Sequence, residues 1–442
     1  MPNRSRHGRT EPTRTTGTGP GDRGARAKQR AFCVGVLEDG DPGDELLELK
    51  ELLRTAGVAV VGEEIQNREK VHPNTYLGPG KLEEVKTAAK AADANVIAVD
   101  GELTPRQERN MEAVLGIPVV DRTATILDIF AGHAHSAEGK LQVELAQLQY
   151  NMARMRGLWT HLERLGGGIG TRGPGESQIE TDRRLARDRI SALKRRLEEV
   201  KGTRATMRAE RERAHLPQIA LAGYTNAGKS TLLNQLTGAE VGVRDRLFHT
   251  LDPTTRTWRL HGRTYLLTDT VGFIRKLPHQ LVQAFGATLE ETRRADLILH
   301  VVDASAEEED REQMMRAVDE VLEEIGAGER PRMLVLNKID ALDEEAREML
   351  ARRFPEAVMV SAATGDGVAT FGERIAEEFE RRLQDIELLL PYSEGARLAE
   401  LHEIAGDLER VETPEGVRVH ARVPESVAER FAPFLVVDPQ PA

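Results

Sequence analysis

The chain has 442 residues, of which 30% are charged and 39% hydrophobic, and a formal net charge of −12. At roughly 150 residues per domain, this length predicts about three domains of ordinary globular composition. No apolar run approaches the ~20 residues that span a bilayer, and the N-terminus lacks the apolar core of a secretory signal, so we expect a cytoplasmic protein. The single cysteine, Cys33, excludes a disulfide framework and is expected to be a buried thiol in a strand.

The N-terminal third predicts a tail followed by a small domain. Residues 1–30 carry eight basic side chains against two acidic ones and are rich in Gly, Pro, Ser and Thr, which predicts a disordered basic tail. From 31 to 136 apolar runs alternate with helical patterns, which predicts an α/β domain with a mostly parallel sheet. The expected strands are Phe32–Leu37, Val58–Val61, Val96–Val99 and Ile117–Val120. The turn at 78–81, Gly-Pro-Gly-Lys, precedes a helix and is either a plain loop or a second phosphate site.

Two heptad seams follow within residues 137–214. Apolar side chains recur at spacings of four and three from Leu141 to Met155, and the same spacing returns from Ala186 to Val200. Such patterns predict two helices that fold back as an antiparallel hairpin. Their connection, residues 157–176, holds seven glycines and a proline. We therefore expect a long loop at the tip of the hairpin, either disordered or functional.

A glycine loop lies in the middle of the chain. The apolar run Ile219–Ala222 leads into the string GYTNAGKS and then into a helical stretch. A strand, a glycine loop and a helix form the context of a P-loop, in which backbone N–H groups and the helix N-terminus surround a phosphate. Lys229 is expected to reach the β- and γ-phosphates, and Ser230 to ligate Mg²⁺. The predicted phosphate-binding residues are Gly223, Tyr224, Thr225, Asn226, Ala227, Gly228, Lys229, Ser230 and Thr231.

The string Asn-Lys-Ile-Asp at 337–340 follows another apolar run and indicates which base is bound. The carboxylate of Asp340 can accept hydrogen bonds from guanine N1–H and the exocyclic amine, whereas adenine offers neither. Asn337 and Lys338 are expected to brace the loop and cover the base, and the segment 361–363 to offer a backbone N–H to the guanine oxygen. The predicted base-binding residues are Asn337, Lys338, Ile339, Asp340, Ser361, Ala362 and Ala363.

Two further segments predict the metal site and the switch. Asp269 ends a predicted strand and is placed to hold Mg²⁺ through water, and the Gly272 N–H is placed to contact the γ-phosphate. Thr250 is expected to ligate Mg²⁺ only while the γ-phosphate is present, which makes an order–disorder switch; Thr254 and Thr255 are the alternatives. The predicted catalytic residues are Lys229, Gly272 and Thr250, and the predicted metal ligands are Ser230, Thr250 and Asp269. The other nucleotide contacts expected here are Phe248, His249, Leu251, Asp252, Thr270 and Val271.

These motifs together resemble a known family. The four nucleotide motifs, the string FHTLDPTTR, the glycine-rich linker at 157–184 and the preceding α/β domain are similar to the HflX family of bacterial ribosome-associated GTPases, in the Obg–HflX group. The resemblance covers residues 31 to about 385; the basic tail departs from it and the last ~55 residues match loosely. It implies a translation-factor-type P-loop GTPase domain over 215–383. It also implies binding to the 50S subunit, a linker near the peptidyl-transferase centre, and splitting of stalled 70S ribosomes or a role in ribosome biogenesis.

The resemblance also bears on catalysis. Ras-like enzymes carry a water-orienting glutamine directly after the glycine that corresponds to Gly272, but this chain has Phe273. We therefore expect slow intrinsic hydrolysis that a partner accelerates. Asn226 is similar to the asparagine of GTPases that use K⁺ as a second cation; the alternative is a side chain that braces the loop.

The predicted hairpin is basic within an acidic chain. Residues 151–213 hold sixteen Lys and Arg against nine Asp and Glu, a local charge of +7. Counterion release makes such a segment attractive to RNA phosphates, and aromatic side chains can stack on unpaired bases. A solvated coiled coil is the alternative, and the resemblance favours RNA. The candidate RNA-binding residues are Trp159, His161, Arg164, Arg172, Arg183 and Arg184.

Residues 384–442 predict a small α+β domain, with a helix over 394–404, a strand over 417–423 and a helix over 424–431. Three functions fit the whole chain. The favoured one is a GTP-driven ribosome factor, whose partners are GTP, GDP and the 50S subunit with its rRNA, and which acts as a monomer. The others are a signalling switch with protein partners and an RNA-remodelling ATPase with a second nucleotide at 78–81.

Overall fold

The computed structural model describes residues 29–37, 46–155, 174–213, 216–238, 247–248, 253–275, 286–405 and 408–436. The expected basic tail lies outside the described residues except for its last two positions, and so does the glycine-rich connection up to residue 173. The chain divides into two compact units, Met1–Arg122 and Thr123–Ala442.

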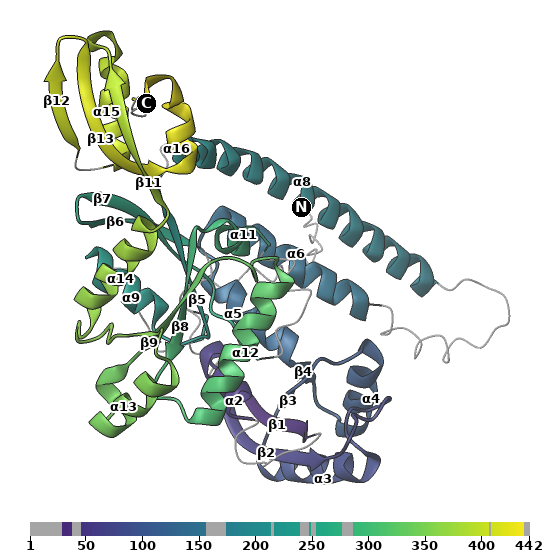
Figure 1. Ribbon diagram of the computed structural model, residues 1–442. Helices are drawn as coiled ribbons and strands as arrows, with labels where there is room; N and C mark the ends of the chain where they lie inside the picture. The colour runs from purple at the N-terminus through teal and green to yellow at the C-terminus, as the bar shows by residue number, and fades with distance from the viewer. Residues whose placement is uncertain are drawn as a thin grey trace, which may run out of the picture. The chain divides into compact units, whose positions relative to one another are not determined.

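The first unit is a four-stranded sheet covered by helices (Figure 1). The strands are β1 (Arg30–Leu37), β2 (Ala59–Asn67), β3 (Val96–Val99) and β4 (Val119–Asp121), and the helices are α2 (Leu47–Ala56), α3 (Pro79–Ala91) and α4 (Pro105–Leu115). The strand order is β2-β1-β3-β4, and every pair is parallel. The α/β domain with a parallel sheet that the sequence predicted is present.

The central strand β1 is buried on both faces because successive side chains point to opposite sides. Phe32 and Val34 belong to the core cluster that contains side chains of α3 and α4. Cys33 belongs to the cluster that contains side chains of α2. Burial raises the pKa of the Cys33 thiol to about 12, so it is an inert core thiol, as expected.

Polar groups of the turn at 78–81 form ion pairs and a hydrogen bond within the domain. The Lys81 ammonium pairs with Glu64 at 2.5 Å and with Glu84 at 3.2 Å. The Gly78 N–H donates to Gln66 Oε1 at 2.8 Å. Because these donors are already satisfied, the structure favours a plain loop over a second phosphate site.

The second unit begins with three helices, α5 (Arg122–His133), α6 (Ala137–Arg154) and α8 (Pro174–Arg213). Leu145 of α6 packs with Ile190, Leu193 and Leu197 of α8, so the two heptad seams meet, and α8 runs back along α6 (Figure 1). The helix α8 starts at Pro174, although the sequence predicted loop up to residue 176. Proline is favoured in the first helical turn, where its missing N–H costs no hydrogen bond, and it thereby moves the helix start upstream.

A six-stranded sheet forms the centre of the second unit. Its strands are β5 (Gln218–Gly223), β6 (Thr254–Leu260), β7 (Arg263–Asp269), β8 (Leu297–Asp303), β9 (Arg332–Asn337) and β10 (Val358–Met359), in the order β10-β9-β8-β5-β7-β6. All pairs are parallel except β6 with β7. The sequence analysis did not predict β6, because this edge strand is mostly polar and only Trp258 of it is buried. Thr254 and Thr255, the alternative switch residues, belong to this strand.

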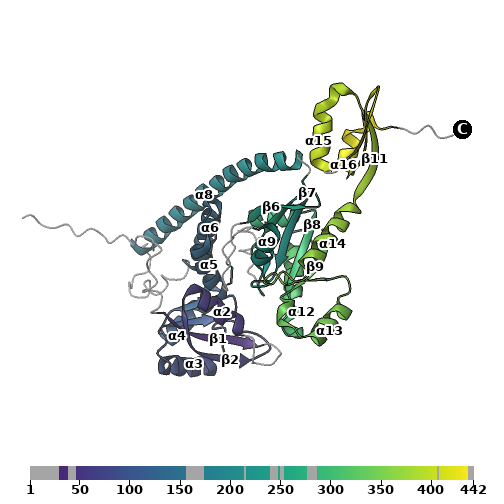
Figure 2. The ribbon, with the colours of Figure 1, turned by 90° about the vertical axis from the view of Figure 1, so that its left-hand side faces the viewer.

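Helices cover both faces of this sheet (Figure 2). Side chains of α9 (Lys229–Thr237) and α14 (Val368–Glu380) share one core cluster with the strands. Side chains of α12 (Glu308–Glu324) and α13 (Glu344–Arg353) lie in a cluster on the other face, and α11 (Gly286–Arg294) follows the loop after β7. Since β5, β7, β8, β9 and β10 are parallel, their carboxyl ends lie along one edge, and the P-loop, Asp269, the guanine motif and Ser361 each lie at one of these ends.

The C-terminal segment forms a separate core. Its strands β11 (Leu383–Leu390), β12 (Glu409–Thr413) and β13 (Gly416–Pro424) are antiparallel in the order β11-β13-β12. Alternate residues such as Leu388 and Val419 are buried together with Phe431, under α15 (Gly395–Ala405) and α16 (Glu425–Arg430). Across the described part of the chain, no helix has the length and apolar character that crossing a membrane requires.

Candidate nucleotide site

The P-loop joins β5 to α9 at the carboxyl edge of the sheet. Gly228 caps α9 with a φ of +92°, and a Cβ built on it would lie 2.2 Å from Asn337 Nδ2. Both the backbone angle and the close approach require glycine. Asn226, the candidate K⁺ ligand, also has a positive φ of 62°. The loop is therefore a tight turn that leads directly into the N-terminus of a helix, where backbone N–H groups favour an anion.

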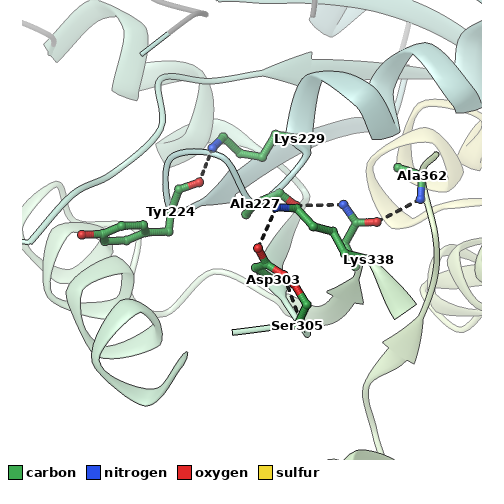
Figure 3. A network of polar contacts seen from close by, with 8 residues as sticks. Tyr224, Ala227, Lys229, Asp303, Ser305, Lys338 and Ala362 are labelled. Atoms are coloured by element: carbon green, nitrogen blue, oxygen red, sulfur yellow. Dashed lines mark hydrogen bonds and ion pairs between the residues drawn. The ribbon is translucent and has the colours of Figure 1, made fainter. Parts of the chain in front are cut away.

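Lys229 is held under this loop. Its side chain is 6% exposed, and its ammonium donates to the carbonyl oxygens of Gly223 at 3.0 Å and Tyr224 at 2.8 Å (Figure 3). Burial lowers the pKa of Lys229 to about 8, although the nearby Asp269 carboxylate opposes the shift. A phosphate beside this ammonium would stabilise its charge. The site is therefore prepared for an anion that the buried lysine needs.

Ser230 and Asp269 lie together at the metal position. The Ser230 hydroxyl donates to Asp269 Oδ2 at 2.5 Å, and the Asp269 side chain is fully buried. Hard oxygen donors in small number suit Mg²⁺, which keeps several waters and binds substrate phosphates as well. The residues present thus fit the ion, and it would neutralise charge on the phosphates. The adjacent Thr270 hydroxyl donates to the Leu221 carbonyl at 2.7 Å and fixes the end of β7 against β5.

The turn after Asp269 is attached to the P-loop by its backbone. The Phe273 N–H donates to the Gly223 carbonyl at 3.1 Å, and the Phe273 carbonyl accepts from the Thr225 N–H at 2.8 Å. The Phe273 side chain is fully buried, and the Arg275 N–H donates to the Tyr224 hydroxyl at 2.8 Å. Gly272, the predicted γ-phosphate contact, is thereby held beside the P-loop.

The guanine motif is connected to the P-loop through Asn337. Its side chain is 1% exposed, donates to the Ala227 carbonyl at 2.8 Å and accepts from the Ala362 N–H at 2.9 Å. Figure 3 labels the two partners, Ala227 and Ala362. Asn337 therefore joins three loops that follow three different strands. Its bracing role, which the sequence predicted, is visible in these two bonds.

Two side chains shape the rest of the base site. The Lys338 ammonium pairs with Asp303 Oδ2 at 2.7 Å, and Ser305 donates to the other carboxylate oxygen of Asp303 through its N–H at 3.0 Å and its hydroxyl at 2.6 Å. Asp340 is exposed and accepts from the Ser361 hydroxyl at 2.6 Å through Oδ1. The carboxylate is thereby oriented while it remains accessible to a base.

The remaining predicted residues fall into two groups. Thr231 is half-buried on α9, Val271 and Ile339 are buried, and Ala363 is exposed beside Ser361. The Phe248 ring packs edge-on against Phe130 of α5, at 4.7 Å between centroids. The predicted residues outside the described part of the chain are His249, Thr250, Leu251, Asp252, Trp159, His161, Arg164 and Arg172.

The sequence analysis missed several groups of this site. Asp303 and Ser305 hold Lys338, and the Tyr224 hydroxyl holds Arg275. A signal for Asp303 was available, because a carboxylate directly ends the apolar run of β8 at the same sheet edge as the other motifs. No local signal indicates the Tyr224 contact.

The assembled groups are those of a guanine-nucleotide site. A buried ammonium and a helix N-terminus suit the phosphates of a nucleotide, two oxygen groups suit Mg²⁺, and an oriented carboxylate suits the hydrogen-bond donors of guanine. Phosphoryl transfer to water in such a site depends on positioning and on charge stabilisation, and it needs no covalent intermediate.

Known families match three consecutive stretches of the chain. The GTP-binding GTPase N-terminal family matches residues 43–131, the GTP-binding GTPase Middle Region family matches residues 133–211, and the 50S ribosome-binding GTPase family matches residues 218–338. The third stretch holds the P-loop, Asp269 and the first two residues of the guanine motif, Asn337 and Lys338.

Individual relatives match over nearly the whole length. GTPase HflX of Lacrimispora saccharolytica is 47% identical over 90% of this chain and 95% of that protein. GTPase HflX of Escherichia coli is 45% identical over 90% of this chain and 94% of that protein. A GTP-binding protein from the archaeon Sulfolobus solfataricus, solved in complex with GDP, is 26% identical over 79% of this chain and 98% of that chain, with a TM-score of 0.40. The chain thus belongs to the HflX family of ribosome-associated GTP-binding proteins and is a GTP hydrolase.

Proposed function

We propose that this GTPase is a factor of the large ribosomal subunit that holds the 50S particle in its GTP state and leaves it after hydrolysis to GDP and phosphate. Its task is the splitting of stalled 70S ribosomes or a step of ribosome biogenesis. The observation that carries the proposal is the set of exposed basic side chains on α8, in the same chain as a GTP site.

Most basic side chains of the described part of α8 are exposed. Its apolar side chains face α6, whereas five basic side chains are exposed: Arg184, Arg187, Lys194, Arg195 and Arg196. No ion-pair partner is found for these five among the residues that the structure describes; Arg189, by contrast, pairs with Glu144 at 2.6 Å. Cations without a carboxylate partner in the described part of the chain are suited to the phosphate backbone of rRNA. Arg183 is half-buried, so Arg184 is the better contact of the two candidates on this helix.

The bound nucleotide would determine when the protein binds the 50S subunit and when it leaves. Asp269 and Ser230 would hold Mg²⁺, and Thr250 would add its hydroxyl only when the γ-phosphate is present. Release of phosphate then removes the groups that order this segment, and the affinity for the subunit falls. A ligand can shift such an equilibrium only by its differential affinity for the two states, so GTP and GDP must differ in how they engage the loops around residues 250 and 272.

Sedimentation of ribosomes tests the proposal. The test uses sucrose gradients of 50S subunits with GTP, GDP or a non-hydrolysable GTP analogue. We expect the protein to co-sediment with the subunit when the analogue is present and to separate from it when GDP is present. With 70S particles, the analogue is expected to raise the 50S and 30S peaks if the protein splits ribosomes. An absence of sedimentation with any particle in all three nucleotides would contradict the proposal.

A matched pair of variants tests the role of α8. Replacing Arg184, Arg187 and Arg195 by Gln is expected to weaken 50S binding and to lower the slope of log affinity against log salt by roughly 0.7–0.9 for each lost phosphate contact. The control replaces three exposed arginines of the GTPase unit, by which we mean the GTPase domain over 215–383. The three arginines, each changed to Gln, are Arg293, Arg352 and Arg381. Equal losses of 50S affinity in the two triple variants would show a general effect of charge. In that case α8 would not be part of the interface.

The connection before α8 needs its own test. A Trp159→Ala/Arg172→Ala double variant is expected to bind 50S subunits more weakly while it binds GDP as the parent does. Unchanged affinity and salt slope would remove these two residues from the RNA contact. A comparison of hydrolysis rates with and without 50S subunits then measures how strongly the partner accelerates the reaction.

A further inference from the structure

GTP hydrolysis in this site needs a polar group that the recognised motifs do not supply. A water molecule must be oriented for attack on the γ-phosphorus. Phe273, the residue after Gly272, has no hydrogen-bonding side-chain atom, and its ring is fully buried. Its backbone N–H and carbonyl are both engaged by the P-loop. The orienting group for basal hydrolysis must therefore come from another residue close to the γ-phosphate position.

The Thr225 side chain lies at that position. A Cβ built on Gly272 would lie 2.8 Å from Thr225 Cγ2, 2.9 Å from Thr225 Cα and 3.1 Å from Lys229 Nζ. Lys229 and the Gly272 N–H are the two groups that contact the γ-phosphate in a P-loop GTPase site. Thr225 thus stands beside both of them.

The hydroxyl of Thr225 is buried and has no hydrogen-bond partner. The residue is 7% exposed, and no acceptor or donor for Oγ1 is found within the described residues. A buried polar group without a partner is rare, because it loses its bonds to water and gains none in return. Thr270, the threonine of the neighbouring turn, shows the usual arrangement, since its hydroxyl donates to the Leu221 carbonyl. A ligand that is not part of the protein is a physical explanation for the difference.

The turn that covers Thr225 is the one that must move for GTP. With Gly272 in contact with Thr225 and close to the Lys229 ammonium, no space remains between them for a phosphate. When the γ-phosphate enters, Gly272 has to separate from Thr225. This separation moves Gly272 away from the Thr225 methyl group and leaves room for the side chain to turn its hydroxyl toward the γ-phosphate and its attacking water.

We propose that Thr225 is a catalytic residue whose hydroxyl contacts the γ-phosphate and the attacking water. The hydroxyl donates a hydrogen bond to a γ-phosphate oxygen and accepts one from the water. The bond from the water oxygen to the γ-phosphorus forms, the bond from the γ-phosphorus to the bridging oxygen breaks, and the bridging oxygen leaves with GDP. The proton of the water passes to a γ-phosphate oxygen, so Thr225 is unchanged at the end of the reaction.

Two substitutions separate the hydroxyl from the shape of the side chain. Thr225→Val keeps both branches and removes the hydroxyl, whereas Thr225→Ser keeps the hydroxyl and removes the methyl group that faces Gly272. In single-turnover hydrolysis of GTP by the full chain, we expect Thr225→Val to be slower by roughly a hundredfold to a thousandfold, the range for one hydrogen-bond donor lost from the transition state. Thr225→Ser is expected to keep most of the parent rate.

Binding measurements then test whether the lower hydrolysis rate of Thr225→Val comes from weaker stabilisation of the transition state. GDP affinity of Thr225→Val should match the parent, while affinity for GDP with aluminium fluoride, which mimics the transferring phosphoryl group, should fall with the rate. The proposal is overturned if Thr225→Val hydrolyses GTP at the parent rate, or if Thr225→Ser is as slow as Thr225→Val. It is also overturned if GDP binding weakens as much as binding of the analogue. These assays contain no ribosomes, so their outcome is independent of the proposed partner.

Discussion

Asn337 joins the base loop, the P-loop and the loop after β10, so its removal should affect stability and nucleotide binding together. In Asn337→Ala the Ala227 carbonyl and the Ala362 N–H both lose their partner, and these residues are only 1% and 4% exposed. Each buried group left without a partner costs about 1–3 kcal/mol. We therefore expect the free energy of unfolding of the GTPase unit to fall by about 3 kcal/mol, which lowers the melting temperature by roughly 6–12 °C.

Tryptophan fluorescence can follow this unit alone. The chain has two tryptophans, and Trp258 lies in the core of the sheet that carries the site. In a Trp159→Phe background, urea unfolding monitored at Trp258 reports the stability of the surrounding core. Calorimetry on the same variants measures GDP affinity, which we expect to fall at least tenfold because the two loops that Asn337 connects hold opposite ends of the nucleotide.

The control is Asn151→Ala, the same substitution at an exposed position of α6. It should change neither the unfolding midpoint nor GDP affinity. The reasoning is refuted if Asn337→Ala loses less than about 1 kcal/mol of stability and binds GDP as the parent does, because a buried bridge of two hydrogen bonds cannot be removed at so small a cost.

Three other outcomes follow from the site. Asp340→Asn should bind xanthosine diphosphate in preference to GDP, because the new amide donates to the 2-oxo group; retained GDP preference in calorimetry would mean that Asp340 does not face the base. The pKa of Lys229 is lowered to about 8 without ligand, and bound phosphates raise it. GDP binding should therefore take up a proton at pH 8.5 but not at pH 6.5. For the same reason the affinity for GDP should fall as the pH rises above 8. Binding heats in buffers of different ionisation enthalpy measure this uptake. If Asn226 holds K⁺, hydrolysis should be faster in KCl than in NaCl, and equal rates would exclude that role.

Much of the fold followed from local pattern. A strand buried on both faces needs an unbroken apolar run, and β1, β3 and β8 show such runs in the sequence. Parallel strands place their carboxyl ends at one edge, so polar motifs that directly follow such runs are expected to meet there. The sequence predicted the P-loop, Asp269, the guanine motif and Ser361 because each is a short polar motif that directly follows an apolar run.

Other features depend on which strands become neighbours. Strand β6 is polar on its exposed face and forms at the sheet edge because β7 offers it an antiparallel partner. The Asn337 bond to Ala227 spans 110 residues, and the Lys338 pair with Asp303 spans 35. Sequence periodicity indicates that a residue is buried, but it does not say which distant group will satisfy its hydrogen bonds.

The sequence by itself indicated the chemistry of this protein: a phosphate loop and a carboxylate for guanine, each following a strand, and two oxygen groups suited to Mg²⁺, Asp269 at the end of a strand and Ser230 at the start of a helix. Tertiary structure decided how those groups are held, through Asn337 between three loops and Asp303 beneath Lys338. It also decided that Thr225 packs against Gly272 and that its buried hydroxyl finds no hydrogen-bond partner in the described part of the chain. The physical reason is that residue type fixes what a side chain can bind, whereas strand order and register fix what lies within its reach.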